Sequence, residues 1–251
     1  IGGVQMTVDG YVFQNDPRIF GITKAVFFPE SQSFDHHEFP YDPGKGMKAK
    51  IDDIISRLIP HLGINNSFFN VELRVDEDSG DVRIIEVNSR IAFQFAKTIQ
   101  TVRGVDPLHW LCDVAVGEDP AACVESDDGP YPYCYNFELR EFSDKWVVKA
   151  PIQANIEEIR LSCPDVSVRN MVRDNTRLSD YKHNPESYRY CVLDIPGISR
   201  EDIMRRYEDV MSMLGYEFQD VTETFEPPVT SEQKGRLMPW DNPPPLHTPG
   251  E

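Results

Sequence analysis

The chain has 251 residues, of which 40% are hydrophobic and 27% are charged, a composition that is ordinary for a globular protein with a buried core. Its formal net charge of -17 argues against nucleic acid as a partner, because a phosphate backbone repels so acidic a surface. The sequence contains no apolar run that approaches the roughly 20 residues needed by a membrane-spanning helix, so we expect no membrane partner either.

The cysteines are odd in number, widely spread and never arranged as a Cys-x-x-Cys pair. This usage favours free thiols in a reducing compartment over disulfides or a zinc site. The first residues also lack the pattern of a signal peptide. The sequence therefore predicts a cytoplasmic protein, and it leaves the oligomeric state open, with a homodimer among the alternatives. The cysteines are Cys112, Cys123, Cys134, Cys163 and Cys191.

Up to residue 91 the chain shows several strand patterns and one helical pattern. Asp9-Gly10 is a dipeptide typical of a hairpin turn between two strands. From Lys45 to Leu62 the apolar residues recur at helical spacing, and Gly63 is well placed to end that helix. The strands expected in this part cover residues 4–8, 11–13, 19–28, 34–39, 69–74 and 84–90.

Beyond residue 91 we expect two helices and then a second, smaller unit. Asp106-Pro107 is a good helix start, with a capping side chain and a proline in the first turn. Residues 125–132 are rich in Asp, Gly and Pro and form the predicted boundary. The elements expected here are helices at 92–102, 106–116, 156–161 and 200–214, and strands at 133–142, 146–149, 166–172 and 188–193.

This pattern predicts three parts in the chain. The first is a domain at residues 1–124, and the second is a small α+β domain at residues 131–221. The third is a tail at residues 226–251, which we expect to be disordered because polar residues and prolines dominate it.

Two of the predicted strands flank an acidic turn and carry polar residues that face each other. If the turn is centred on Ser79, Glu72 lies across the ladder from Glu86, and Asn70 lies across from Asn88. Directly opposed side chains have Cβ atoms about 5 Å apart, and like charges at that distance destabilise a sheet. Two carboxylates and an amide oxygen on one face make sense if a hard cation lies between them, because Mg²⁺ prefers oxygen ligands.

Arg90 occupies the next position on the same face, where its guanidinium could hold a phosphate oxygen. The alternative is that the Glu-x-Asn-x-Arg pattern is the solvated face of an edge strand, where charged side chains are common. The apolar residues that alternate with it, such as Val71, Leu73 and Val87, favour two strands in the centre of a sheet. We therefore expect a nucleotide-phosphate site here.

Residues 68–120 resemble the second half of an ATP-grasp domain, of the kind seen in carboxylate–amine ligases and biotin carboxylase. The resemblance depends on Glu72, on the Glu86-x-Asn88-x-Arg90 motif and on the Gly-Val-Asp helix start that follows. It extends over about residues 4–120 and is fainter from residue 131 to 218. It implies an α+β fold, namely an ATP-grasp C-terminal subdomain with an antiparallel sheet and flanking helices, followed by a small α+β domain.

The resemblance also implies the roles of individual residues. Glu72, Glu86 and Asn88 would hold two Mg²⁺ (or Mn²⁺) ions on ATP, with Glu86 bridging both ions. Arg90 would be the catalytic residue that contacts the transferred phosphate or the substrate carboxylate. Lys24 would bind the nucleotide phosphates, with a solvated strand lysine as the alternative. One departure is Ser89, because the family commonly has proline at this position, and serine leaves Arg90 less rigidly held.

The function implied by the resemblance is that of an ATP-dependent ligase. Such an enzyme activates a carboxylate as an acyl phosphate, which an amine or another nucleophile then attacks, so its partners are small-molecule carboxylates and amines. The glycine-rich phosphate loop and the adenine hinge of the family are not recognisable before Glu72, so we expect this chain to be the metal-binding half of a ligase. Two alternatives stay open: a nucleotide- or metal-binding remnant without turnover, and a structural domain with a solvated acidic face.

Overall fold

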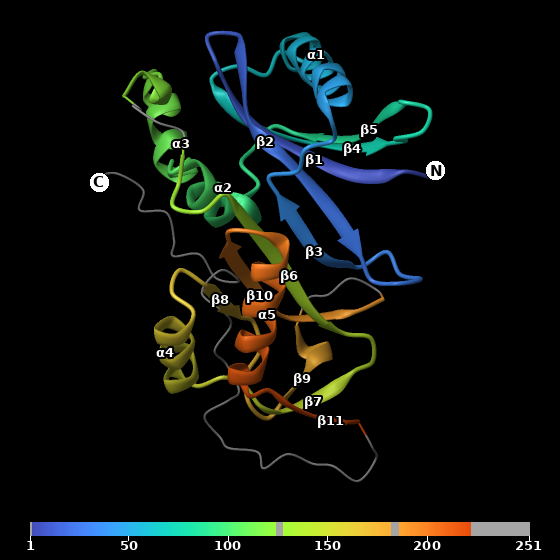
Figure 1. Cartoon of the computed structure of the whole chain (residues 1–251), viewed down its shortest axis with the longest axis vertical. Helices are drawn as coiled ribbons and strands as arrows, with labels where there is room; N and C mark the ends of the chain where they lie inside the picture. The colour runs from blue at the N-terminus through green and yellow to red at the C-terminus, as the bar shows by residue number, and fades with distance from the viewer. Residues whose placement is uncertain (1, 124–127, 182–185, 222–251) are drawn as a thin grey trace, which may run out of the picture.

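The computed structural model describes residues 2–123, 128–181 and 186–221, and in this part of the chain the strands form two antiparallel sheets (Figure 1). Within the described residues, the larger sheet has eight strands in the order β5-β4-β1-β2-β3-β6-β10-β8, and the smaller one has the order β11-β7-β9. Helices pack against both faces of the larger sheet. The predicted α+β class is confirmed, because helices and antiparallel sheets build the fold together.

The elements have the following bounds. The larger sheet contains β1 (Val4–Phe13), β2 (Asp16–Phe27), β3 (Phe34–Phe39), β4 (Ser67–Val75), β5 (Val82–Asn88), β6 (Tyr133–Glu141), β8 (Ser167–Asn170) and β10 (Tyr188–Gly197). The smaller sheet contains β7 (Lys145–Lys149), β9 (Thr176–Arg177) and β11 (Glu217–Asp220). The helices are α1 (Lys45–His61), α2 (Ala96–Arg103), α3 (Pro107–Val116), α4 (Gln153–Ser162) and α5 (Arg200–Leu214), with short 3-10 turns at Phe93–Phe95, Pro120–Cys123 and Leu178–Asp180.

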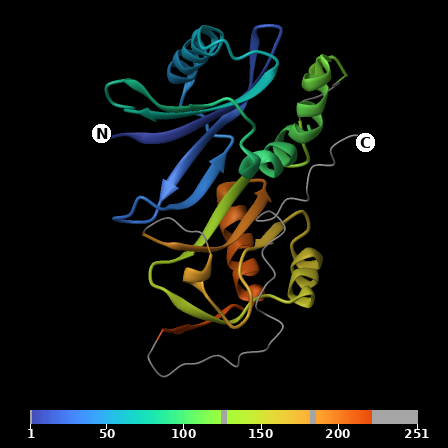
Figure 2. The same cartoon turned by 180° about the vertical axis from the view of Figure 1, so that it is seen from behind.

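The two faces of the larger sheet differ in what covers them. On one face, α1 packs its fully buried Ile51, Ile55 and Ile59 against the apolar side of β1 and β4. Further along the same face, α5 packs on β6 and β10. On the opposite face, α2 and α3 cover an aromatic cluster at one end of β1, β2 and β4. Figure 2 shows this arrangement from behind. The rest of that second face carries the polar side chains described below.

The larger sheet runs through both parts of the chain, because β3 pairs with β6. Within this pair, His36 lies opposite Phe137 and Phe39 lies opposite Cys134. The division into residues 1–124 and 131–221 stays a prediction. The tail predicted at residues 226–251 lies outside the described residues.

The turn predicted at Asp9-Gly10 is wrong. β1 continues through these residues as far as Phe13, and the chain reverses at Gln14 and Asn15, which have φ values of 50° and 66°. Gly10 serves a close approach of backbones instead, since a Cβ atom there would lie 2.2 Å from the carbonyl oxygen of Arg18. The dipeptide therefore marks a tight packing point inside a strand rather than a turn.

Candidate functional site

The β4–β5 hairpin has the register that the sequence predicts at its polar residues. Glu72 pairs with Glu86, and Asn70 pairs with Asn88. The hairpin is not regular along its whole length, however. The pairs nearer the turn are shifted by one residue relative to the expected register, because Ile85 is an extra residue in β5. This bulge returns Glu86 and Asn88 to the face that carries Glu72. Two carboxylates and an amide thus meet on one face of the sheet, as expected.

The expectation that both strands lie in the centre of the sheet is wrong for β5. Among the described strands, β5 pairs only with β4 and forms the edge of the larger sheet (Figures 1 and 2). Its apolar Ile84 and Ile85 are 44% and 49% exposed, whereas Val71 and Leu73 of β4 are fully buried. The apolar composition of β5 therefore does not reflect burial in this part of the protein.

A chain of hydrogen bonds links the polar side chains on this face. Asn88 Nδ2 donates to Glu86 Oε1 at 2.7 Å and to Asn70 Oδ1 at 3.4 Å. Asn70 Nδ2 in turn donates to Asp9 Oδ1 at 2.8 Å. On the other side, Gln5 Nε2 donates to Glu72 Oε2 at 3.0 Å, so amide groups from β1, β4 and β5 surround the carboxylates.

The electrostatics of this acidic face favour a bound cation. Burial, together with the charge and the hydrogen-bonding contact of Glu86, raises the pKa of Glu72 above its ordinary value. Among the described residues, no Lys, Arg or His forms an ion pair with Glu72 or Glu86. Carboxylate and amide oxygens are the ligands that Mg²⁺ prefers, so Glu72, Glu86 and Asn88 fit such an ion. These three residues would supply only part of the coordination sphere of the ion. In the described residues, no group of three or more His, Cys, Asp and Glu side chains could hold a metal on its own.

Arg90 lies next to Asn88 at the end of the hairpin, as predicted. It is exposed, its Nη1 donates to the carbonyl oxygen of Ile91 at 3.2 Å, and its Nη2 lies 3.5 Å from Asn88 Oδ1. Its positive charge also lowers the pKa of Glu72, although this effect is smaller than that of burial. The guanidinium is therefore held loosely beside Asn88 and is free to turn towards an anion.

The structure places Lys24 on the opposite face of the sheet from Glu72. Lys24 pairs with Met6, whose side chain lies in the apolar cluster under α1, whereas Glu72 pairs with the neighbouring Thr7. Adjacent residues of a strand point to opposite faces, so the two groups are separated by the sheet. Lys24 Nζ instead lies 3.9 Å from Glu38 Oε2. The predicted site residues thus come together, except for Lys24.

Sequence reasoning missed Asp9, which lies on the same face as Glu72. Its side chain is 3% exposed, and burial raises its pKa to about 7 even though the hydrogen bond from Asn70 acts in the opposite direction. In the described residues its Oδ2 atom has no hydrogen-bond partner. The residue was interpreted as half of a turn signal, and only the strand register brings it beside Asn70, 61 positions further along the chain.

A second acidic group lies on the same face but is neutralised by protein cations. Glu138 of β6 is 1% exposed and forms ion pairs with Arg140 and with Arg189, the latter at 3.0 Å. Gln94 Nε2 adds a hydrogen bond to Glu138 Oε1 at 2.8 Å. The adjacent His37 is held neutral, since burial lowers its pKa to about 4. Gln94 follows the Arg90 loop, so this cluster ties that loop to β6.

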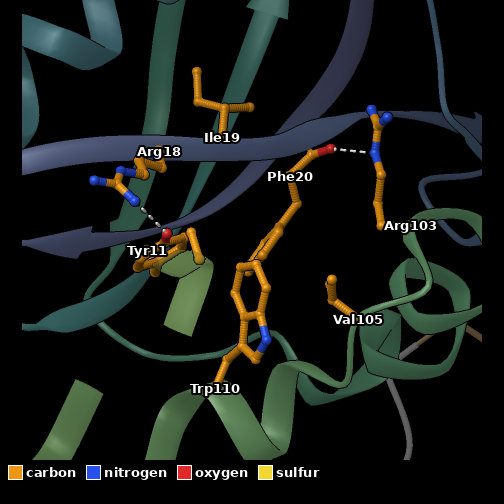
Figure 3. A pocket seen from close by; sticks show the side chains of 8 residues that line it. Tyr11, Arg18, Ile19, Phe20, Arg103, Val105 and Trp110 are labelled. Carbon is orange, nitrogen blue, oxygen red and sulfur yellow. Dashed lines mark hydrogen bonds between the residues drawn. The ribbon is translucent and has the colours of Figure 1, made fainter. Parts of the chain in front are cut away.

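A hollow of about 200 Å³ lies beside α3, at the end of β1 and β2 (Figure 3). Its wall is aromatic, with the rings of Tyr11 and Trp110 packed edge to face at 5.3 Å and Phe20 beside them. Arg18 Nη1 donates to Tyr11 Oη, and Arg103 Nε donates to the carbonyl oxygen of Phe20 at 2.7 Å. Both arginines serve the packing of the hollow, and none of the predicted ligands lines it.

Solved structures of several enzymes share this architecture. An L-amino acid ligase from Bacillus licheniformis superposes with a TM-score of 0.69 at 17% identity, over 88% of this chain and 55% of the other. A phosphoribosylglycinamide synthetase from Anaerococcus prevotii does so with a TM-score of 0.67 at 14% identity, over 86% and 54%. A biotin carboxylase from Campylobacter jejuni reaches a TM-score of 0.62 at 12% identity, over 86% and 46%. The fold is that of the ATP-grasp enzymes.

The ATP-grasp likeness concerns the fold, because the identities are low. The chain spans about half the length of these ligases and carboxylases. No protein-family model matches the sequence, and no curated protein matches it. Among the helices of the described residues, none is both long and apolar enough to cross a membrane.

Proposed function

We propose that this chain carries the Mg-ATP-binding part of an ATP-dependent ligase. The observation that carries the proposal is the pair Glu72 and Glu86, two opposed carboxylates for which the described residues supply no ion-paired cation. The ATP-grasp fold supports the same function, since the neighbours that share it are ligases and carboxylases. The biotin carboxylase among them was solved as a complex with an ATP compound.

The roles that we propose are those implied by the ATP-grasp resemblance, and the positions of the side chains support them. Glu72, Glu86 and Asn88 would hold two Mg²⁺ (or Mn²⁺) ions. Bound there, the ions would neutralise charge on the β- and γ-phosphates of ATP. Arg90, which lies at the rim beside Asn88, would hold the phosphoryl group as it passes to the carboxylate. Lys24 is left out of this phosphate site, because it lies on the other face of the sheet.

The reaction that we propose is the activation of a small carboxylate as an acyl phosphate, which an amine or another nucleophile then attacks. Formation of a carbon–nitrogen bond is the favoured outcome. The proposed compartment is the cytoplasm, which suits the free thiols of Cys112, Cys134, Cys163 and Cys191.

The proposal can be tested by thermal unfolding with Mg²⁺ or Mn²⁺, with and without ATP. At a hundred times the dissociation constant, a bound ligand stabilises a protein by about 2.7 kcal/mol, or roughly 5–10 °C for a chain of this size. We expect Glu72→Gln and Glu86→Gln to abolish the rise. Asp78→Asn, an equal charge change at an exposed position of the same hairpin, should leave it intact.

The proposed cation site is wrong if the unchanged protein shows no rise with either ion. If the rise is seen, release of ADP by the full-length protein in the presence of carboxylates and amines separates a ligase from a protein that binds nucleotide without turnover. The same two glutamate variants should abolish that release.

A further inference from the structure

We propose that Asp9 is a positioning residue that determines, through Asn70, the direction in which the side-chain oxygen of Asn88 points. The inference rests on the proposed function of the β4–β5 hairpin as a divalent-cation site. It concerns a residue on a different strand, which would not itself touch the ion.

The first step is the contact between Asp9 and Asn70. Asp9 Oδ1 lies 2.8 Å from Asn70 Nδ2. An ionised carboxylate has acceptors only, so it selects the orientation of Asn70 in which the NH₂ group faces β1. The side-chain oxygen of Asn70 must then face β5.

The second step is the contact between Asn70 and Asn88, through which the orientation of Asn70 determines that of a side chain in β5. Asn70 Oδ1 is an acceptor, so Asn88 must turn its NH₂ group towards it, and the two atoms are 3.4 Å apart. The same NH₂ group donates to Glu86 Oε1 at 2.7 Å. Both protons of Asn88 are thus engaged within the sheet. Its Oδ1 atom is left on the side of Arg90, whose Nη2 atom donates to it at 3.5 Å, and a bound cation would replace this long contact.

The burial of Asp9 requires a reason beyond packing. Asp9 and Asn70 are 3% and 4% exposed, and Asp9 Oδ2 has no partner among the described residues. A buried carboxylate that receives so few hydrogen bonds destabilises a fold. An asparagine would fill the same space without a charge. What the ionised carboxylate adds is that neither of its oxygens donates. It therefore fixes the direction of Asn70, and Asn70 supports the direction of Asn88 that Glu86 also favours.

The direction of Asn88 matters because a hard cation binds the oxygen of an amide and not its NH₂ group. Residues that orient a metal ligand typically contribute 10- to 100-fold to metal affinity. Asp9→Asn removes the group that orients this chain of hydrogen bonds. The new amide can donate to Asn70, so that the side chains of Asn70 and Asn88 can both turn by about 180°.

The test compares Asp9→Asn with the exchange variant Asp9→Asn/Asn70→Asp, at pH 8. In the exchange variant, the carboxylate at position 70 accepts from position 9 and from Asn88, so Asn88 keeps its direction. We expect Asp9→Asn to weaken Mn²⁺ binding, measured by electron paramagnetic resonance, about tenfold. The exchange variant should bind Mn²⁺ within about threefold of the unchanged protein.

A second readout needs no metal, and in it the exchange variant serves as a control with the same net charge as the unchanged protein. In the unchanged protein and in the exchange variant, the side-chain NH₂ protons of Asn88 should exchange slowly with water, because two acceptors hold them. In Asp9→Asn they should exchange faster, as measured by nuclear magnetic resonance. Unchanged exchange in Asp9→Asn would overturn the inference, whatever the Mn²⁺ affinity is.

The remaining outcomes separate this inference from the proposed function. If the unchanged protein binds no Mn²⁺ while the Asn88 protons respond as expected, the cation site fails and the orienting role of Asp9 stands. If Asp9→Asn does not fold, the exchange variant decides alone. Faster exchange of its Asn88 protons than in the unchanged protein would then overturn the inference.

Discussion

Two groups of carboxylates on one face of the larger sheet differ in how their charge is balanced. Glu138 is almost fully buried, yet its pKa lies below its ordinary value: burial alone would raise it, and Arg189 and Arg140 more than offset that effect. Glu72 is less buried, yet its pKa is raised by burial and by Glu86. The more deeply buried group is thus the better satisfied one.

The comparison distinguishes a structural cluster from a candidate binding site. A buried ion pair whose partners are all present needs nothing further, and breaking it is costly. Opposed carboxylates without a counter-ion are instead a source of repulsion in the isolated chain. At the hairpin, the missing charge can be supplied by a cation from solution, which is why we place the function there.

The largest effect is expected at Glu138. Glu138→Gln leaves the buried Arg140 beside Arg189 without a counter-ion, and removal of one partner of a buried pair costs about 3–5 kcal/mol. Chemical denaturation measures this cost. Glu208→Gln, at an exposed position of α5, is the matched control and should leave the free energy of unfolding unchanged. If Glu138→Gln lowered the free energy of unfolding by no more than an ordinary surface substitution does, the contrast between Glu138 and the Glu72–Glu86 pair would be lost.

The next effect is a pH dependence due to Asp9. Because its pKa is about 7 in the folded state and 3.8 ordinarily, the folded protein binds the extra proton between these values. Stability attributable to Asp9 therefore falls as the pH rises from about 4 to about 7. Asp9→Asn should gain about 2 kcal/mol more in free energy of unfolding at pH 8 than at pH 5. An equal gain at both pH values would show that Asp9 has an ordinary pKa.

A smaller effect of opposite sign to that at Glu138 is expected at Glu72. Without divalent ions, Glu72→Gln relieves the repulsion from Glu86 and should stabilise the chain by about 0.5–1 kcal/mol. With Mn²⁺ in excess, the unchanged protein should become the more stable of the two. Thermal unfolding in the presence of a chelator and then of Mn²⁺ checks both signs. Destabilisation by Glu72→Gln in the chelator would place Glu72 with Glu138 as a structural carboxylate.

The smallest effect is expected at Lys24. Lys24→Met should change the free energy of unfolding by less than about 0.5 kcal/mol, because Arg200 and His36 still contact Glu38. Since the sheet separates Lys24 from the hairpin, the Mn²⁺ affinity should stay within about twofold. A clear loss of Mn²⁺ affinity in this variant would contradict the separation of the two faces.

Local signals predicted the elements whose ends are capped within a few residues. The helix expected at residues 200–214 is α5, which begins after a Ser199 cap and ends before Gly215 in the left-handed conformation. The strand expected at residues 34–39 is β3. The opposed pairs of the β4–β5 hairpin were also predictable, since both strands lie close together in the sequence.

Features set by distant pairings could not be predicted from local patterns. β5 is an edge strand because β1, from the start of the chain, takes the other side of β4. The face on which Lys24 lies depends on its register with β1, and the role of Asp9 depends on Asn70. A strand pattern alone indicates neither which strands become neighbours nor which face is covered.

Ile85, the extra residue of β5, makes the site unequally sensitive to changes in chain length. Deletion of Ile85 would leave a regular strand in which Glu86 still opposes Glu72 and Asn88 keeps its face. Deletion of Val87 would move Asn88 into the place of Val87, on the far side of the sheet. Two single-residue deletions, two positions apart on an exposed edge, would thus have different consequences. Deletion of Ile85 would keep Glu72, Glu86 and Asn88 on one face of the sheet, and deletion of Val87 would remove Asn88 from it.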